Sequence, residues 1–403
     1  MHIAIIGAGG REHALKWKLE QDGHSAALIP YNPVHKLSLT TRDAQLVIVG
    51  PEAPLADGVV DRLMHAGLPA FGPSQAAAKL ESSKAFAKAF MARHGIPTAR
   101  FAVFDDFAGA ERHLQQVDYP VVIKASGLAQ GKGVIVPRDA DEAQAALRAI
   151  MVEHAFGSAG DQVVIEERLE GPEVSLMAFC DGETVVPMPP AQDHKRAFDG
   201  DQGPNTGGMG AFCPSPLMKR ENIAYCVSNI LQPTVHGMAQ EGVPYRGVLY
   251  AGLMLTRDGP KVLEFNCRFG DPETQAVLPL LKTDLAEIAL ACIEGQLNAQ
   301  SVEWHAGACA CIVLASGGYP GAYRKGLPIH GLDAVPDDVM IFHAGTRQTE
   351  SGWVTDGGRV LGVAARGDTL SDALRRAYAG IAPISFEGMH YRRDIGAAWL
   401  QRD

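Results

Sequence analysis

The densest set of reactive side chains lies in residues 261–275, which read KVLEFNCRFGDPETQ. The apolar start predicts a strand, joined to the strand before it by a hairpin turn at Asp258-Gly259. On this strand Glu264 and Asn266 face the same side because they are two residues apart. Their oxygens are ligands that a hard cation such as Mg²⁺ prefers. Arg268 and Asp271 follow, at a turn before an expected helix. Alone, the E-x-N pair also fits a solvated strand edge with Arg268 as ion-pair partner, and the glycine-rich loops elsewhere favour the metal site.

A second candidate site is the glycine-rich stretch after the expected strand 120–124. Lys124 ends that strand, and Gly131, Lys132 and Gly133 lie in the turn that follows. A lysine at a strand end before a glycine-rich hairpin predicts a mobile flap that closes over phosphates. The stretch lacks the Walker A pattern, and no H-R-D or D-F-G motif of a protein kinase accompanies it. The alternative is a flexible hairpin with solvated lysines.

The chain begins with an apolar strand at residues 2–6, followed by Gly7-Ala8-Gly9-Gly10-Arg11 and a helical run. This order is typical of a phosphate- or nucleotide-binding α/β unit. Glu12 stands where a dinucleotide fingerprint has its third glycine, which disfavours a nicotinamide-dependent oxidoreductase. We expect Gly9, Gly10 and Arg11 to meet a small phosphate. A tight turn without a ligand is the alternative.

Residues 188–216 show little secondary-structure pattern, and we expect a long loop there. A loop of this length in a compact chain indicates a functional segment. It contains Asp193, His194 and Lys195, and then the run N-T-G-G-M-G from Asn205 to Gly210. A single histidine in a charged loop is weak support for a general base.

Composition narrows the class of protein. The 403 residues allow several domains, and the net charge of −10 disfavours nucleic acid or an anionic membrane as the main partner. The 7 cysteines contain no C-x-x-C pair, which predicts reduced thiols in a cytoplasmic protein. We expect no signal peptide, and no apolar run approaches the about 20 residues of a membrane span. We expect small-molecule partners and a monomer or weak homo-oligomer.

Together these motifs resemble the phosphoribosylamine–glycine ligases (glycinamide ribonucleotide synthetases) of the ATP-grasp superfamily. The matching segments follow the family's order and include IGAGGREHAL, VGPEAPLADG, KASGLAQGKGV, QDHKR, GPNTGGMGA, GGRVLGV and, most specifically, RFGDPETQ. The resemblance implies an α/β and α+β multidomain chain. Its parts would be a doubly wound N-terminal substrate-binding domain at 1–75, an ATP-grasp core at 76–118 and 184–316, a flap subdomain at 119–183, and a small α+β C-terminal domain at 317–403.

The resemblance also implies a reaction. ATP would drive the ligation of glycine to 5-phosphoribosylamine through a glycyl phosphate, giving glycinamide ribonucleotide, ADP and phosphate in purine biosynthesis, with Mg²⁺ or Mn²⁺ as the metal. The implied roles are ATP binding for Lys84, Lys124, Gly131, Lys132, Gly133, Glu166, Leu169 and Glu173; metal binding for Glu264 and Asn266; catalysis for Arg268, Lys124 and Asp193; and binding of glycine or the sugar for Gly9, Gly10, Arg11, Asp193, Lys195, Asn205, Gly208 and Asp271.

One departure from the family lies between the second and third expected strands. Family members usually carry a P-G-N-x-G loop there, followed by a further strand and helix. Here Pro30-Tyr31-Asn32-Pro33 stands in its place, and only residues 30–45 separate the strands, which is too short for a full crossover. An ATP-grasp carboxylate–amine ligase with a different amine substrate is therefore the alternative. A second alternative, an ATP-binding protein without turnover, is disfavoured by the intact Glu264 and Lys124. We also expect a stand-alone enzyme.

Overall fold

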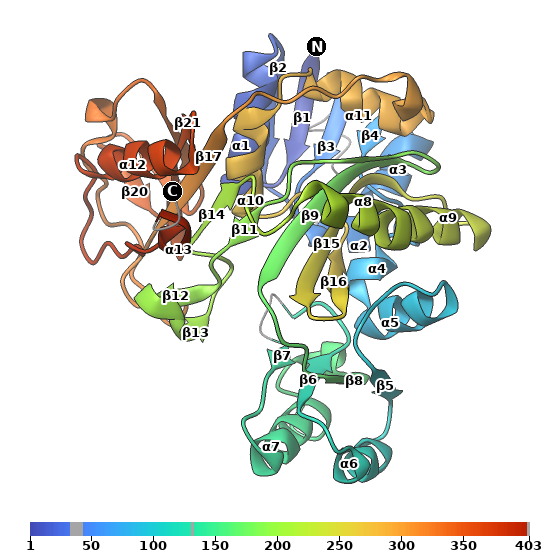
Figure 1. Cartoon of the computed structure of the whole chain (residues 1–403). Coiled ribbons are helices and arrows are strands. Elements are labelled where there is room, and N and C mark those ends of the chain that lie inside the picture. Colours follow the sequence, from blue (N-terminus) through green and yellow to red (C-terminus); the bar gives the residue numbers. More distant parts are fainter. Residues whose placement is uncertain (33–42, 130–132, 401–403) are drawn as a thin grey trace.

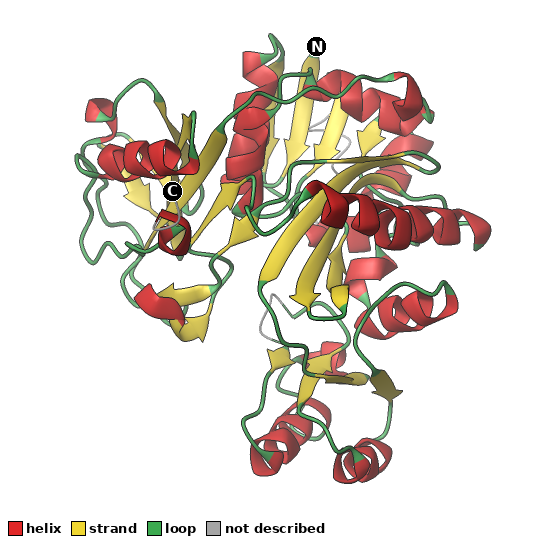
Figure 2. Cartoon of the chain, viewed as in Figure 1, coloured by secondary structure: helices red, strands yellow, loops and turns green. Residues whose placement is uncertain are grey.

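The structure, a computed structural model, describes residues 1–32, 43–129 and 133–400. Figures 1 and 2 show the amino-terminal unit above a central sheet, a small lobe projecting below it, and the carboxy-terminal unit to one side. Among the described residues, no helix combines the length and the apolar character needed to cross a membrane. The predicted α/β and α+β multidomain class is confirmed.

The amino-terminal unit is a parallel sheet in the order β2-β1-β3-β4 with helices on both faces. Ile3 and Ile5 pack on the face that α1 covers, whereas Ala4 and Ile6 pack towards α2 and α3. Burial on both faces explains why these strands are apolar throughout. The bounds are β1 (His2–Ile6), β2 (Ser25–Ile29), β3 (Leu46–Val49), β4 (Ala70–Phe71), α1 (Gly10–Gln21), α2 (Glu52–Ala56) and α3 (Val59–His65).

The central sheet is antiparallel and has the order β10-β9-β15-β16. Leu249 and Ala251 of β15 pack in a core shared with α5 and α9, whereas Val248 and Tyr250 pack in one shared with α10 and α11. The predicted hairpin turn at Asp258-Gly259 joins β15 to β16. The bounds are β9 (Glu173–Asp181), β10 (Val185–Pro187), β15 (Arg246–Thr256), β16 (Gly259–Asn266), α5 (Lys84–Arg93), α9 (Gln232–Gln240), α10 (Glu273–Val277) and α11 (Leu285–Glu294).

The projecting lobe is a sheet in the order β5-β8-β6-β7 packed on α6 and α7. Strand pairing groups the chain differently from the predicted flap range of 119–183. β5 precedes that range but pairs with β8, and β9 lies within it but pairs with β15 of the central sheet. The bounds are β5 (Phe101–Phe104), β6 (Val121–Ala125), β7 (Val134–Ile135), β8 (Val163–Glu167), α6 (Phe107–Gln116) and α7 (Ala140–Met151).

The carboxy-terminal unit shares a sheet with the middle of the chain, in the order β11-β14-β17-β21-β18. The prediction of a long loop at 188–216 was wrong, because this range contains β11, β14 and the separate pair β12–β13. The bounds are β11 (Gln192–Asp193), β12 (Arg196–Phe198), β13 (Gln202–Asn205), β14 (Gly210–Cys213), β17 (Ala308–Ala315), β18 (Val339–His343), β19 (Thr346–Thr349), β20 (Gly352–Thr355), β21 (Arg359–Gly367), α12 (Leu370–Ile381) and α13 (Ala397–Leu400).

The helical stretch from 79 to 93 is interrupted at Ser83, which separates α4 (Lys79–Ser82) from α5. The Ser83 hydroxyl accepts a hydrogen bond from Phe86 N at 3.2 Å and so caps α5. The break makes Lys84 the first residue of α5. A second helical stretch runs without a break from α8 (Arg220–Cys226) through a π-helical turn, η4 (Val227–Leu231), into α9.

Candidate active site

A cleft of about 1090 Å³ is lined by residues from the amino-terminal unit, the lobe, the central sheet and the carboxy-terminal unit. Most residues singled out from the sequence line it, although they come from distant parts of the chain. These are Arg11, Lys84, Lys124, Gly133, Glu166, Leu169, Glu173, Lys195, Asn205, Glu264, Asn266, Arg268 and Asp271. Gly131 and Lys132 lie outside the described residues.

Four other predicted residues, Gly9, Gly10, Asp193 and Gly208, are not among those that line the cleft. Gly9 N already donates to Glu12 Oε2 at 2.7 Å, so this N–H is directed at the protein rather than at a ligand. Asp193 accepts from Lys195 Nζ at 3.2 Å. Of the four, Asp193 therefore contacts a side chain that lines the cleft, namely Lys195.

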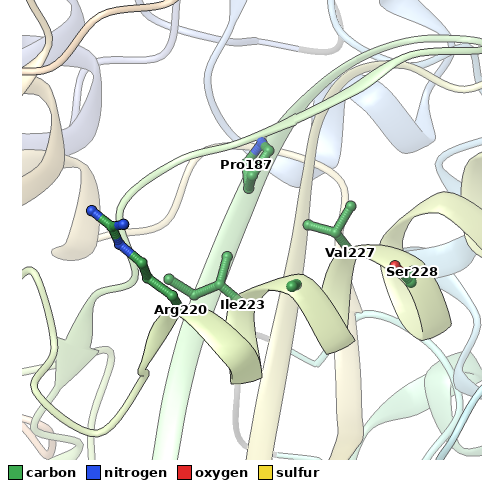
Figure 3. A pocket seen from close by; sticks show the side chains of 6 residues that line it. Pro187, Arg220, Ile223, Val227 and Ser228 are labelled. Carbon is green, nitrogen blue, oxygen red and sulfur yellow. The ribbon is translucent and has the colours of Figure 1, made fainter.

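A smaller hollow of about 360 Å³ lies on the outer surface between β10 and α8 (Figure 3). Its lining is mainly apolar, with Arg220 at one end. None of the sequence-predicted site residues contributes to it. The larger cleft is therefore the candidate active site.

One end of the cleft carries a cluster of lysines around a single carboxylate. Glu166 of β8 forms ion pairs with Lys124 of β6 and with Lys88 of α5. Burial alone would raise the pKa of Glu166, but the two ammonium groups hold this pKa below its ordinary value. The Glu166 side chain is thus engaged by the protein, so any contact with a nucleoside would fall to its backbone.

The candidate metal ligands lie beside this cluster. Glu264 and Asn266 of β16 both line the cleft, as their two-residue spacing requires. Burial lowers the pKa of Lys84, and the nearby Glu264 opposes this shift. In the described part of the chain, no group of three or more His, Cys, Asp or Glu side chains could hold a metal ion. Two oxygen ligands suit an ion that is also held by water and phosphate oxygens, as Mg²⁺ commonly is.

Arg268 lies between two acidic side chains that the sequence did not single out. Its Nη2 is 3.1 Å from Glu81 Oε1, and its Nε is 3.5 Å from Glu52 Oε2. Nη2 also donates to Asn266 Oδ1 at 3.2 Å, which links the arginine to the candidate metal ligand. These contacts hold the guanidinium in one orientation at the cleft wall.

The opposite end of the cleft is organised around Asp271. Arg359 of β21 contacts Asp271 Oδ2 at 3.0 Å, and Gln275 Nε2 donates to Asp271 Oδ1 at 2.8 Å. Burial alone would raise the pKa of Asp271, but the Arg359 and Arg11 guanidinium groups lower it. Arg359 Nη1 also donates to Gly207 O at 2.6 Å. This end therefore presents fixed positive charge and a carboxylate to a ligand.

Gly208 allows the segment after β13 to approach the turn at Asp271-Pro272 closely. Its φ is +109°, and a Cβ atom there would lie 2.4 Å from Pro272 Cδ. Only glycine satisfies both the backbone conformation and the space. Gly208 therefore allows close packing of this segment against Pro272, next to Asp271.

A buried hydrogen-bond cluster borders the cleft. Tyr250 OH donates to Glu273 Oε1 at 2.7 Å, and Ser175 Oγ lies 2.6 Å from Tyr250 OH. Burial is the larger cause that raises the pKa of Glu273, and the nearby Asp193 carboxylate raises it further. Tyr250 and Ser175 line the cleft, so this cluster forms part of its wall.

An apolar section adjoins the lysine cluster. Its side chains come from α5, β6, the segment after β8, and the strands β15 and β16, and are Met91, Val122, Leu169, Leu253 and Leu263. An apolar slot with polar groups beside it suits a flat aromatic ring such as a nucleobase.

Sequence reasoning missed several residues that line the cleft, among them Glu52, Glu81, Lys88 and Arg359. One signal was present for Lys88. It follows Lys84 by one helical turn, so both lysines share a face of α5. Glu52 and Arg359 also stand in segments that matched the family, VGPEAPLADG and GGRVLGV.

The chain matches three models of one family. The ATP-grasp (A) domain of phosphoribosylglycinamide synthetase matches residues 82–274, the C domain residues 309–398, and the N domain residues 34–81. Among curated relatives, phosphoribosylamine–glycine ligase of Vibrio vulnificus is 47% identical, with 100% of this chain and 99% of that protein covered. The corresponding protein of Caldanaerobacter subterraneus is 46% identical, with 99% and 100% covered.

The trifunctional purine biosynthetic protein adenosine-3 of Homo sapiens is 50% identical, over 99% of this chain. The chain spans only 42% of the length of that relative. Among solved structures, phosphoribosylamine–glycine ligase of Thermotoga maritima aligns with a TM-score of 0.85 at 34% identity, covering 98% of this chain and 100% of that one. A biotin carboxylase of Campylobacter jejuni aligns with a TM-score of 0.72 at 14% identity, over 97% and 92% of the two chains, and shares the fold.

The fold and the match to the ATP-grasp (A) domain place this chain in the ATP-grasp class. This chain belongs to the phosphoribosylglycinamide synthetase family.

Proposed function

We propose that this protein joins glycine to 5-phosphoribosylamine at the expense of ATP, giving glycinamide ribonucleotide, ADP and phosphate, as a step of purine biosynthesis. The observation that carries the proposal is the shared cleft. Its lining includes the lysines Lys84 and Lys124 with the candidate metal ligands Glu264 and Asn266, and also Arg11, Arg359 and Asp271. Phosphoryl transfer and the attack of the amine both require these two sets of side chains to line the same cleft. The names of the full-length relatives support the identity of the substrates.

The chemistry has two steps. A carboxylate oxygen of glycine first attacks the γ-phosphorus of ATP, and ADP leaves. The amine of phosphoribosylamine then attacks the carbonyl carbon of the glycyl phosphate, phosphate leaves with the bonding electron pair, and the amine loses a proton. Neither step needs a covalent bond to the protein. The side chains must therefore position the reactants, neutralise charge and exclude water.

We assign the nucleotide to the end with the lysines. Lys84, Lys124 and the flap with Gly131, Lys132 and Gly133 would bind the phosphates, and the segment from Glu166 through Leu169 to Glu173 would border the nucleoside. Leu169 contributes to the apolar slot, and Glu173 accepts from Lys195 Nζ at 2.7 Å at its exposed rim. This division matches the charge of each end to the group it would hold.

The oxygen ligands Glu264 and Asn266 fit Mg²⁺ or Mn²⁺. Bound with ATP, such an ion would neutralise charge on the phosphate oxygens. Arg268 would face the reacting carboxylate, with Asn266 and Glu81 fixing its orientation.

We assign glycine and the sugar to the other end. Arg11, Asp271, Lys195 and Asn205 would contact these substrates, since all four line the cleft. Asp193 would hold Lys195, whose Nζ donates to its carboxylate. Gly9, Gly10 and Gly208 would shape the backbone beside Arg11 and Pro272. The fixed guanidinium groups of Arg11 and Arg359 suit the sugar phosphate. Arg11 is held in place because its Nη1 donates to Phe269 O at 3.1 Å.

The setting of the reaction completes the proposal. All 7 cysteines are free thiols and all are buried, which supports a reducing compartment such as the cytoplasm. We infer small-molecule partners and a monomer or weak homo-oligomer, because each unit contributes to a single cleft within one chain.

The test is ADP release with Mg²⁺-ATP and glycine, with and without freshly generated phosphoribosylamine. We expect release to require both substrates and glycinamide ribonucleotide to form. Tight nucleotide binding without release would contradict the assigned acceptor. In that case, the short segment between β2 and β3 would mark a ligase for a different amine, and other carboxylate–amine pairs would be screened.

A further inference from the structure

The lysine cluster belongs to a closed ring of polar groups that begins and ends on β16. The Thr98 hydroxyl donates to Val262 O at 2.7 Å and accepts from Lys88 Nζ at 2.7 Å. Lys88 pairs with Glu166, and Glu166 pairs with Lys124. Lys124 Nζ then donates to Leu263 O at 3.2 Å, next to the carbonyl at which the ring began.

The ring crosses the junction between the lobe and the central sheet. Lys124 and Glu166 stand on the lobe strands β6 and β8, Lys88 stands on α5, and the two carbonyls belong to the strand that carries the candidate metal ligands. A change in the direction of the lobe would break these contacts. The ring therefore fixes where Lys124 lies relative to Glu264.

The charges within the ring are unequal. Lys88, Lys124 and Glu166 are buried, with only 2%, 5% and 2% of their surfaces exposed. Two ammonium groups share one carboxylate, and a buried excess charge is costly unless an opposite charge approaches it. All three residues border the cleft, so an anion in the cleft would supply that charge.

We propose that Lys88 is a positioning residue for the phosphoryl donor: through Glu166 it holds Lys124 against the nucleotide phosphates, and those phosphates complete the charge balance of the ring. The inference rests on the use of ATP in the proposed function, but not on the identity of the amine. Lys88 acts through Glu166 and need not touch the nucleotide.

The ring also makes nucleotide binding depend on pH. Burial lowers the pKa of Lys88 to about 8, with Glu166 opposing and Lys124 adding to this shift. The charged groups that face Lys88 are Glu166 of β8, Lys124 of β6 and, further away, Glu264 of β16. Nucleotide phosphates favour the charged amine, so binding above pH 8 is expected to take up a proton and to weaken as the pH rises.

The first test is calorimetric titration of the full chain with Mg²⁺-ADP, which reports binding without turnover. Lys88→Met keeps the length and the apolar stem but removes the charge. We expect about tenfold weaker binding or more, as for loss of a group that orients a ligand contact. Lys79→Met is the matched control, since Lys79 is an exposed lysine on the preceding helix, α4. The affinity of this variant for Mg²⁺-ADP is expected to equal that of the wild type. Equal affinities for Lys88→Met and the wild type would overturn the proposal.

The second test separates positioning from simple destabilisation. In a double-mutant cycle, the effects of Lys88→Met and Lys124→Met on the affinity for Mg²⁺-ADP should be strongly non-additive, since both residues act through Glu166.

The third measurement is the pH dependence of the affinity for Mg²⁺-ADP. The affinity of the wild type should fall between pH 7.5 and pH 9, and that of Lys88→Met should change less with pH. Additive effects with an unchanged pH profile would refute the role. If Lys88→Met fails to fold, Thr98→Val removes the hydroxyl that anchors Lys88 and is expected to weaken binding in the same direction.

These binding measurements do not depend on which amine the enzyme uses as its acceptor. Normal Mg²⁺-ADP binding by the wild type without glycinamide ribonucleotide formation would reject the proposed amine and leave the ring testable. Ligase activity of the wild type combined with unaltered nucleotide affinity in both the Lys88 and the Thr98 variants would reject the ring alone.

Discussion

Glu81 aims Arg268. One carboxylate oxygen of Glu81 lies 3.1 Å from Arg268 Nη2, and the other accepts the N–H of Cys267 at 2.7 Å. Burial raises the pKa of Glu81, and the Arg268 guanidinium opposes this shift. A single acid on α4 thus orients both the arginine and the backbone that precedes it.

Glu81→Gln keeps an acceptor for Cys267 N but removes the charge that faces Arg268. We expect kcat/KM to fall about tenfold to a hundredfold, because small displacements of a positioned group have effects of this size. Steady-state kinetics for each substrate would measure it. Glu52→Gln is the comparison, since Glu52 lies further from Arg268 at 3.5 Å and should matter less. A larger loss in Glu52→Gln would contradict the ranking.

Glu264→Ala should abolish turnover while the fold remains, because a candidate metal ligand is lost from a half-buried position and little core volume is removed. We expect the rate to fall about a hundredfold or more, as charge stabilisation by the ion contributes several kcal/mol. Activity as a function of Mg²⁺ and Mn²⁺ concentration, together with the melting temperature, would check this. Glu303→Ala, an exposed acid paired with Lys282, should behave as the wild type. Near-normal activity of Glu264→Ala would reject the metal assignment.

Arg359→Lys should raise KM for the acceptor about tenfold and leave KM for ATP nearly unchanged. A lysine cannot bind Gly207 O and the Asp271 carboxylate with the geometry of the planar guanidinium. The comparison of the two KM values is the measurement. Arg347→Lys, at an exposed position on β19, serves as the control. An equal rise in KM for ATP would show that Arg359 acts on the whole cleft rather than on its acceptor end.

The contact between α1 and β18 should make stability fall in acid. The His13 and His343 rings lie 5.2 Å apart, and burial lowers the pKa of each from 6.5 to about 4. The unfolded chain therefore binds protons below pH 6.5 that the folded chain takes up only near pH 4, so stability is lost as the pH falls across this window.

Thermal unfolding between pH 7 and pH 4.5 would measure this loss. His343→Phe keeps a ring against Trp353 and removes one titrating group, so its melting temperature should depend less steeply on pH. The exposed His65→Gln should retain the wild-type slope. Identical slopes for His343→Phe and the wild type would contradict the expectation.

The sequence was informative wherever the local pattern and the tertiary role coincide. The strand at 2–6, the hairpin at Asp258-Gly259 and the shared face of Glu264 and Asn266 were predicted, since each follows from a short-range period or turn. The strands β11 and β14 within 188–216 were missed because non-local pairing stabilises them. β11 pairs with β14, and β14 pairs with β17, about a hundred residues later. A two-residue strand leaves no period to detect.

The candidate site shows the same division. Lys124 and Arg268 were identified because they stand in glycine-rich or acidic motifs, whereas Glu81, Lys88 and Arg359 appear in helix or strand segments typical of solvated charges. Their importance depends on partners that only the fold brings near. The prediction that Gly9 offers its N–H to a phosphate could not anticipate that Glu12 already accepts it.

The shared sheet restricts how this enzyme could be recombined with its relatives. β17 pairs with β14 on one side and with β21 on the other, and all of its residues are buried. A chimaera joined just after Ala315 would place two strands of different ancestry against each other, and a fragment ending there would expose an apolar edge that invites aggregation. A crossover point before Ala308 would instead transfer β17 together with β21, so that only the pairing of β17 with the short β14 would join strands of different origin.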